Sequence, residues 1–168
     1  MSDLDHFNSA PADDLRSELL GLTAAPQWVE ALLEHRPYDD VDALLATSDE
    51  IVLALPEAQI DAALAGHPRI GERAAGLDAE SADRSAREQA SMSGADSSLK
   101  AAMTRGNAAY EARFGRIYLV AAAGRSAEDL VGFLRGRLDN APDTELDVVR
   151  GQLARITRLR LSDRLTND

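Results

Sequence analysis

The stretch that decides the fold is residues 144–165, which read TELDVVRGQLARITRLRLSDRL. Apolar side chains recur there at steps of three or four residues, which places them on one face of a helix: Leu146, Val149, Leu153 and Ile156. A helix with such a stripe buries it against other parts of the chain. The sequence therefore predicts that the chain ends in a long helix that packs into a helical core.

The rest of the chain also has the composition of helices. Aromatic residues make up only 4% of the chain, whereas alanine and leucine are abundant, and this mixture favours helices over strands. With Asn8 or Ser9 as the first cap, helices are expected at residues 11–20, 26–34, 41–46, 49–55, 56–64, 96–114 and 126–138.

The remaining segments are expected to be shorter or irregular. A capping box at residues 85–88 predicts one more helix start. The β-branched and aromatic segment 117–120 is expected to be locally extended, and residues 69–84 to form a loop that borders a pocket. The sequence thus predicts an all-α fold, a single-domain bundle of about eight helices over residues 1–168.

Charge and composition exclude several function classes. The net charge of −11 argues against a nucleic-acid partner, because phosphate binding needs a basic face. No apolar run is long enough to cross a membrane, and residues 1–7 do not resemble a signal segment, so we expect a cytoplasmic protein. The chain has no cysteine, and its three histidines are widely spaced, so no metal site is expected.

His67 is the first candidate for chemistry. It lies between Gly66, at the expected end of a helix, and Pro68, which keeps the preceding residue out of the α region. A stiff, non-helical link therefore holds an imidazole, the side chain that titrates nearest neutral pH. A rigidly held imidazole is a candidate for proton transfer, although a histidine on a surface loop is the commoner case.

Arg160 is the second candidate. It continues the apolar stripe of the last helix four residues beyond Ile156, so its guanidinium is expected to point inward. A buried arginine needs a carboxylate or an anionic ligand as partner. The alternatives are a clamp for an anionic ligand and a structural ion pair or snorkelling side chain at the helix end.

The capping box supplies a third group of candidates. Ser85, Glu88 and Gln89 would present a hydroxyl, a carboxylate and an amide at one helix N-terminus, which suits a polar, partly anionic ligand. The structural alternative is that Glu88 only caps the backbone of Ser85.

Taken in order, these pieces resemble a known family. The motifs are His-Pro-x-x-Gly at 67–71, Ser-x-x-Glu-Gln at 85–89, Tyr-x-x-x-Phe-Gly at 110–115, Arg-Leu-x-Asn at 137–140, Glu145, and Ile-x-x-x-Arg-Leu at 156–161. The chain resembles, over nearly its whole length, the 2-oxo-4-hydroxy-4-carboxy-5-ureidoimidazoline (OHCU) decarboxylases, which form (S)-allantoin in the route from urate.

The resemblance implies specific roles. It implies an all-helical homodimer that needs no cofactor or metal and acts on a small anionic substrate. His67 would be the essential catalytic residue, with Glu88 and Arg160 beside it. The substrate would also contact the following residues: Pro68, Ser85, Gln89, Ile117, Tyr118, Leu119 and Val120.

Two departures from the family pattern leave alternatives open. Many relatives have Ala-Gly after Glu-Gln where this chain has Ala90-Ser91, and Phe-Gly-Phe-x-Phe where it has Phe114-Gly-Arg-Ile-Tyr118. The exchanges around Arg116 and Tyr118 leave room for a decarboxylase or lyase acting on a related ureido or keto acid. The remaining alternative is a non-enzymatic interaction module that uses the acidic surface.

Overall fold

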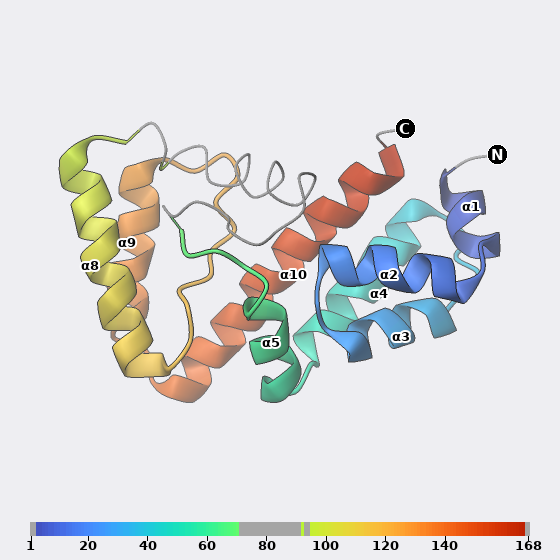
Figure 1. Ribbon diagram of the computed structural model, residues 1–168, viewed down its shortest axis with the longest axis horizontal. Helices are drawn as coiled ribbons and strands as arrows, with labels where there is room; N and C mark the ends of the chain where they lie inside the picture. Colours follow the sequence, from blue (N-terminus) through green and yellow to red (C-terminus); the bar gives the residue numbers. More distant parts are fainter. Residues whose placement is uncertain (1–2, 71–91, 93–94, 167–168) are drawn as a thin grey trace. The chain divides into compact units, whose positions relative to one another are not determined.

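The computed structural model describes residues 3–70, 92 and 95–166 (Figure 1). Within them the chain forms eight helices and no strand, so the all-α prediction is confirmed there. The helices are α1 (Asp3–Ser9), α2 (Ala12–Leu22), α3 (Pro26–Glu34), α4 (Val41–Leu53), α5 (Glu57–Leu64), α8 (Ser97–Phe114), α9 (Ala127–Arg137) and α10 (Pro142–Thr166).

The chain divides into two compact units. One comprises residues 1–66 and 150–168, and the other comprises residues 67–149. Helix α10 therefore contributes its first two turns to the second unit and the rest of its length to the first. The prediction of a single domain over residues 1–168 is not tested by this division and stays a prediction.

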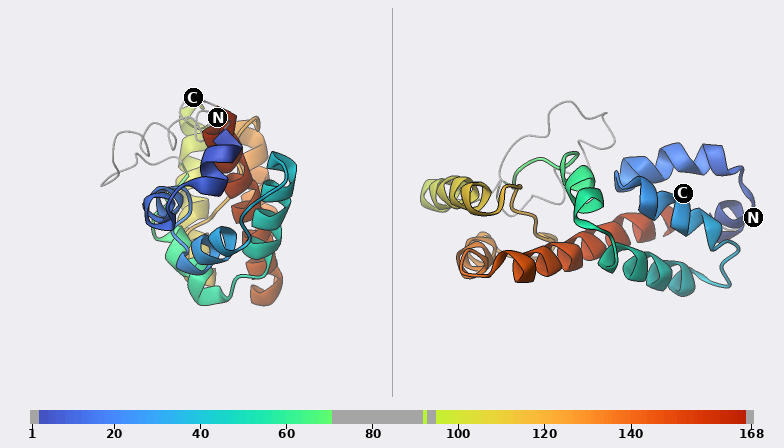
Figure 2. Two further views of the ribbon diagram at one scale, coloured as in Figure 1. Left: turned by 90° about the vertical axis from the view of Figure 1, so that its right-hand side faces the viewer. Right: turned by 90° about the horizontal axis from the view of Figure 1, so that it is seen from below.

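The first unit is a cluster of helices around a tryptophan. Helix α3 packs against both α2 and α4, as the second view in Figure 2 also shows. The Trp28 ring is fully buried, and its Nε1 donates a hydrogen bond of 2.9 Å to Ser48 Oγ on α4. Leu153 and Leu161 of α10 are also fully buried. The apolar stripe of the last helix is thus part of the core, as predicted.

Two expectations for this unit were wrong. Residues 41–46 and 49–55 were expected to form separate helices, but they form the single helix α4. The polar residues between them do not interrupt it, because Thr47 Oγ1 donates to the carbonyl of Ala43 and Ser48 Oγ accepts from Trp28. Asp40, which precedes the helix, caps it through the N–H of Ala43.

The other error concerns the start of the chain. Asn8 and Ser9 were expected to cap the helix that begins near residue 11, but they belong to α1. The Asn8 side-chain amide donates to the Tyr38 carbonyl at 2.9 Å and accepts from the Tyr38 N–H at 2.8 Å. Ser9 Oγ donates within its own helix to Asp5. Ser9 therefore bonds within α1 and Asn8 bonds to the Tyr38 backbone, so neither side chain caps α2.

The second unit is built on the pair α8 and α9, which lie side by side and run in the same direction in Figure 1. The two helices approach closely at Gly106, where an added Cβ would overlap the Leu134 side chain. Gly115 ends α8 in the left-handed region, at φ 73°, where glycine is favoured. The predicted end of this helix is confirmed, and residues 117–120 follow as non-helical chain.

Candidate active site

The link that carries His67 has the predicted character. Helix α5 ends at Leu64, and residues 67–69 are neither helix nor strand. Both His67 and Pro68 are half-buried, so the imidazole is neither sealed in the core nor fully in solvent. A partly shielded, conformationally restricted imidazole is suited to proton transfer.

Helix α8 holds this link at two points. Asn107 Nδ2 donates a hydrogen bond of 3.0 Å to the carbonyl of Ile70, and both residues are 6% exposed. One turn further along α8, Glu111 accepts three hydrogen bonds from the Arg69 guanidinium, of 3.0 and 2.8 Å from Nε and 2.7 Å from Nη2. These bonds lower the pKa of the Glu111 carboxyl. The backbone just after His67 is thus fastened to a long helix.

A cavity of about 260 Å³ lies between this link and α8. Its lining includes Arg69, Ile70 and Asn107, so the predicted pocket beside residues 69–84 is present where that segment is described. The other residues of the segment, 71–84, lie outside the described part of the chain. His67 is not among the described residues that line the cavity.

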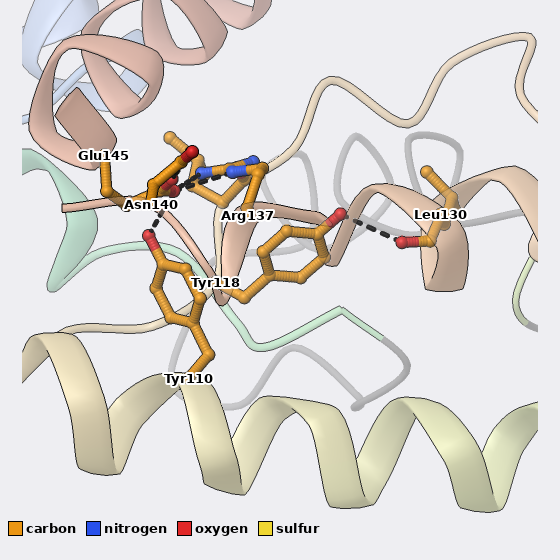
Figure 3. Close-up of polar contacts among 7 residues, drawn as sticks. Tyr110, Tyr118, Leu130, Arg137, Asn140 and Glu145 are labelled. Carbon is orange, nitrogen blue, oxygen red and sulfur yellow. Dashed lines mark hydrogen bonds and ion pairs between the residues drawn. The ribbon is translucent and has the colours of Figure 1, made fainter. Parts of the chain in front are cut away.

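A buried polar network occupies the core of the second unit (Figure 3). At its centre is Glu145, which is 0% exposed and accepts hydrogen bonds from three residues. Arg137 Nε donates to Oε1 at 2.6 Å, Tyr110 OH donates to the same oxygen at 2.7 Å, and Asn140 Nδ2 donates to Oε2 at 2.9 Å. The Tyr-x-x-x-Phe-Gly motif, the Arg-Leu-x-Asn motif and Glu145 thus meet in one cluster.

The network also fixes the segment that was predicted to touch the ligand. Arg137 Nη1 donates a hydrogen bond of 2.6 Å to the carbonyl of Leu119. Tyr118, Leu119 and Val120 are buried, and Ile117 is half-buried. Because this segment is neither helix nor strand, side-chain donors such as Arg137 have to satisfy part of its backbone. The motif residues therefore position the backbone of residues 117–120.

The side chain of Tyr118 is part of the core. Its hydroxyl donates to the carbonyl of Leu130 at 3.0 Å, as Figure 3 shows, and its ring packs edge-on against Tyr110, with 5.5 Å between ring centroids. The Arg137 guanidinium lies 4.9 Å from the same ring. Burial raises the pKa of Tyr118 to about 12, although the nearby Arg137 opposes this rise. The aromatic exchange at this position therefore concerns a side chain of the core.

Arg160 points inward, as the stripe predicts. It is 8% exposed, and its Nη1 donates a hydrogen bond of 2.7 Å to the carbonyl of Leu22 at the end of α2. One turn earlier on α10, Thr157 pairs with Thr23 through their hydroxyls at 2.7 Å. A guanidinium has five N–H donors, and the bond to Leu22 uses one of them and helps to fix its orientation. All of these contacts lie within the first unit.

The other predicted site residues fall in different parts of the chain. Ser85, Glu88 and Gln89 lie outside the described residues, so their roles stay predictions. His67, Pro68 and residues 117–120 belong to the second unit, whereas Arg160 belongs to the first. The assembly of these groups into one active site is therefore also a prediction.

Sequence reasoning missed Asn107. A signal for it exists, because Leu99, Met103, Asn107 and Tyr110 fall at helical spacing on α8. Asn107 is thus a polar residue in an otherwise apolar stripe, and buried polar side chains are hydrogen-bonded as a rule. The same reasoning that singled out Arg160 on α10 applies to this position.

Two further observations narrow the kind of site. Among the described residues, no group of three or more His, Cys, Asp or Glu side chains is arranged to hold a metal ion. No helix in the same part of the chain combines the length and apolarity needed to cross a membrane.

Comparison with known proteins adds independent information. The family model for OHCU decarboxylase matches residues 8–162. The chain is 29% identical to the OHCU decarboxylase of Haloferax volcanii, over 84% of its own length and 83% of that protein. It is 30% identical to the OHCU decarboxylase of Amia calva, over 82% of its length and 79% of that protein.

Solved structures share the fold. A crystal structure of OHCU decarboxylase in the presence of (S)-allantoin matches with a TM-score of 0.74, at 18% identity, over 89% of this chain and 98% of that one. A crystal structure of (S)-allantoin synthase matches with a TM-score of 0.73, also at 18% identity, over 98% of this chain and 54% of that one. At 18% identity the solved structures show only a shared fold, whereas the family model and the sequence relatives show common ancestry. The chain therefore belongs to the OHCU decarboxylase family.

Proposed function

We propose that this protein decarboxylates 2-oxo-4-hydroxy-4-carboxy-5-ureidoimidazoline to (S)-allantoin in urate degradation. The observation that carries the proposal is the family match over residues 8–162, which includes the His-Pro motif, the capping box and the inward-pointing Arg160. Relatives of similar length are OHCU decarboxylases, and a solved relative was crystallised in the presence of (S)-allantoin.

The chemistry sets three requirements. The bond between the substrate carboxylate and the ring breaks, CO2 leaves, and the electron pair stays on the ring carbon. The adjacent C=N or carbonyl group of the substrate delocalises this pair, so we expect the reaction to need no cofactor. A proton must then reach the neighbouring, ureido-bearing ring carbon from one side, because a single enantiomer is formed. The carbon that lost CO2 becomes the carbonyl of allantoin as its hydroxyl proton leaves. The protein has to orient the carboxylate, stabilise negative charge and deliver one proton.

We assign these tasks to the predicted site residues. His67 transfers the proton, and its restricted link supports delivery from a fixed direction. Arg160 binds substrate oxygens and stabilises the negative charge that develops. Glu88 orients the ureido N–H groups or tunes His67, while Ser85, Gln89, Pro68 and the backbone of residues 117–120 complete the pocket.

The charge of the protein gives Arg160 a further task. With a net charge of −11, the protein as a whole repels an anionic substrate. A buried guanidinium provides the local positive charge that binding needs, and its hydrogen bond to Leu22 holds it in place. Arg160→Lys keeps the charge but removes the planar fork of donors, so we expect a higher KM and a lower kcat.

The decisive experiment follows the decay of freshly prepared substrate and the circular dichroism of the product. We expect the wild-type protein to accelerate decay and to yield optically active allantoin. A rate equal to the spontaneous one with a racemic product would contradict the proposed function. A panel of related ureido and keto acids in the same assay tests for a different substrate. Binding of none of them would favour an interaction module.

The variant His67→Asn tests the catalytic role of His67 separately from the family membership of the chain. We expect loss of activity by about 10²–10⁴-fold with an unchanged helical signal, because a general acid or base contributes about that much. His35→Asn is the matched control, since His35 is exposed and its Nδ1 contacts the Ala31 carbonyl one turn earlier on the same helix. Full activity of His67→Asn would remove His67 from the mechanism and leave the family membership intact.

We further propose that the protein is a homodimer in the cytoplasm. The family resemblance supports the dimer, and light scattering coupled to size-exclusion chromatography tests it. A monomeric mass at the concentrations used in the activity assay would contradict it. Fractionation of cells that produce the protein tests the location.

A further inference from the structure

We propose that Asn107 is a positioning residue for His67: its side-chain amide fixes the backbone of the link that carries the imidazole. This inference rests on the proposed function, because it takes His67 to be the residue that transfers the proton. The observation behind it is the hydrogen bond of 3.0 Å from Asn107 Nδ2 to the Ile70 carbonyl.

Regular secondary structure does not hold the link in place. The link follows the end of α5 and has no helix or strand partner over residues 67–69. Pro68 stiffens the bond after His67 but supplies no N–H donor. A contact from outside the link therefore helps to set where its backbone lies, and Asn107 provides one at Ile70.

Asn107 is itself held firmly. It lies in the middle of the 18-residue helix α8, between the buried side chains of Met103 and Tyr110. Gly106, the residue before it, allows the close contact between α8 and Leu134 of α9. Helix α8 therefore fixes the backbone of Asn107, and only the side-chain rotamer remains to be set for the amide to reach the Ile70 carbonyl. The bond transmits the rigidity of α8 to the link.

The hydrogen-bonding atoms of the Asn107 side chain support a role in positioning. Its Oδ1 is buried and has no hydrogen-bond partner in the described part of the chain. A buried unpaired acceptor is unfavourable for stability, so the amide is a poor choice for packing alone. Its donor end, however, meets a backbone carbonyl that is also buried. The asparagine is thus explained by what it holds in place.

The ion pair between Arg69 and Glu111 plays a smaller part. It also joins the link to α8, but the Arg69 side chain is 44% exposed and the Glu111 side chain 26% exposed. Solvent screens such pairs, and their contribution is small. We therefore expect Asn107 to dominate and Glu111 to matter little for the position of His67.

The test compares Asn107→Leu with two controls. Leucine keeps the approximate size and removes the donor, and the loss of one unpaired acceptor offsets the creation of another at Ile70. Met103→Leu changes a buried apolar side chain one turn away on α8, and Glu111→Gln removes only the charge of the outer contact. Steady-state kinetics give kcat and KM, and NMR gives the imidazole resonances, which His67→Asn assigns.

We expect Asn107→Leu to lower kcat by about 10–10²-fold with KM almost unchanged, because small misplacements of a reacting group have effects of this size. The His67 resonance should shift, while those of His6 and His35 stay in place as internal references. Both controls should retain kcat within about twofold, the scale of a screened surface contact.

An unchanged kcat together with an unchanged His67 resonance would overturn the inference. If Asn107→Leu does not fold, Asn107→Asp keeps the side-chain shape while placing an acceptor opposite the Ile70 carbonyl, and the same two readouts apply. The NMR measurement needs no turnover. A protein without decarboxylase activity would therefore refute the proposed function and still test the role of Asn107.

Discussion

Arg137 and Glu145 form an ion pair in the core of the second unit, with Arg137 Nη2 2.5 Å from Glu145 Oε1. Their side chains are 9% and 0% exposed. Each partner is bonded to other groups as well, Arg137 to the Leu119 carbonyl and Glu145 to Tyr110 and Asn140. A buried pair of this kind is expensive to form, but removing one member leaves the other charge without compensation.

We therefore predict that Arg137→Met lowers the free energy of unfolding by about 3–5 kcal/mol, the usual cost of breaking a buried pair. Urea unfolding followed by circular dichroism measures the change. Arg158→Met is the matched control, because the pair of Arg158 with Asp49 is 44% and 32% exposed. The control should lose less than about 1 kcal/mol.

The double variant Arg137→Met with Glu145→Leu checks the cause. Removing both charges should restore part of the stability lost in Arg137→Met, because the uncompensated carboxylate is gone. A double variant that is as unstable as the sum of the two single variants would show that packing, and not charge, determines the loss.

The two tyrosines of the network should differ in their contribution. Tyr110 OH donates to the Glu145 carboxylate, whereas Tyr118 OH donates to the neutral Leu130 carbonyl. Hydrogen bonds to charged groups contribute about 1.5–3 kcal/mol and neutral ones about 0.5–1.5 kcal/mol. We predict a larger loss of unfolding free energy for Tyr110→Phe than for Tyr118→Phe. Equal losses in the same urea experiment would contradict the proposed network.

All three tyrosines should resist alkaline titration. Burial raises the pKa of Tyr38 and of Tyr118 to about 12, from an ordinary value of 10.0. Burial and the bond to Glu145 also raise the pKa of Tyr110. A pKa raised by folding stabilises the native state fully below pH 10 and loses this effect as the pH approaches 12.

The measurement is phenolate absorbance as a function of pH, alongside circular dichroism. We predict that phenolate formation is delayed beyond the ordinary range and then coincides with the loss of helix. Gradual ionisation near pH 10.0, with the helices intact, would show that the phenols are accessible.

The contact between α8 and α9 gives a prediction with an internal control. Gly106→Ala places a Cβ against Leu134, so we expect a loss of about 1–3 kcal/mol from overpacking. Gly132→Ala on α9 meets nothing within 4 Å and should stabilise by about 0.5–1 kcal/mol, the helix preference of alanine over glycine. Thermal unfolding of both variants shows whether each one is destabilised or stabilised. A stabilised Gly106→Ala variant would contradict the close contact.

Much of the described fold follows from helical periodicity. The apolar stripe of residues 144–165 predicts α10 and the inward direction of Arg160, because a helix fixes the angle between successive side chains. The end of α8 at Phe114 also follows, because a glycine comes next. Errors arose where polar side chains had long-range partners, as with Ser48 and Asn8.

The site was less predictable for the same reason. Spacing places Tyr110 and Glu145 in motifs, but their hydrogen bond joins residues 35 positions apart. Arg160 and the Leu22 carbonyl that it contacts are 138 positions apart. Local sequence gives the direction of a side chain on its helix, whereas its partner depends on how helices pack. Asn107 shows that a polar residue in an apolar stripe deserves the same weight as a motif.

The placement of the aromatic residues gives each unit its own optical reporter. Trp28 is the only tryptophan of the chain and lies in the core of the first unit, where Ser48 accepts its N–H. Tyr110 and Tyr118 lie in the second unit. Tryptophan fluorescence therefore follows one unit, and a variant with Tyr38→Phe restricts the phenol signal to the other. Recorded during one denaturation, the two signals measure the folding cooperativity between the units directly.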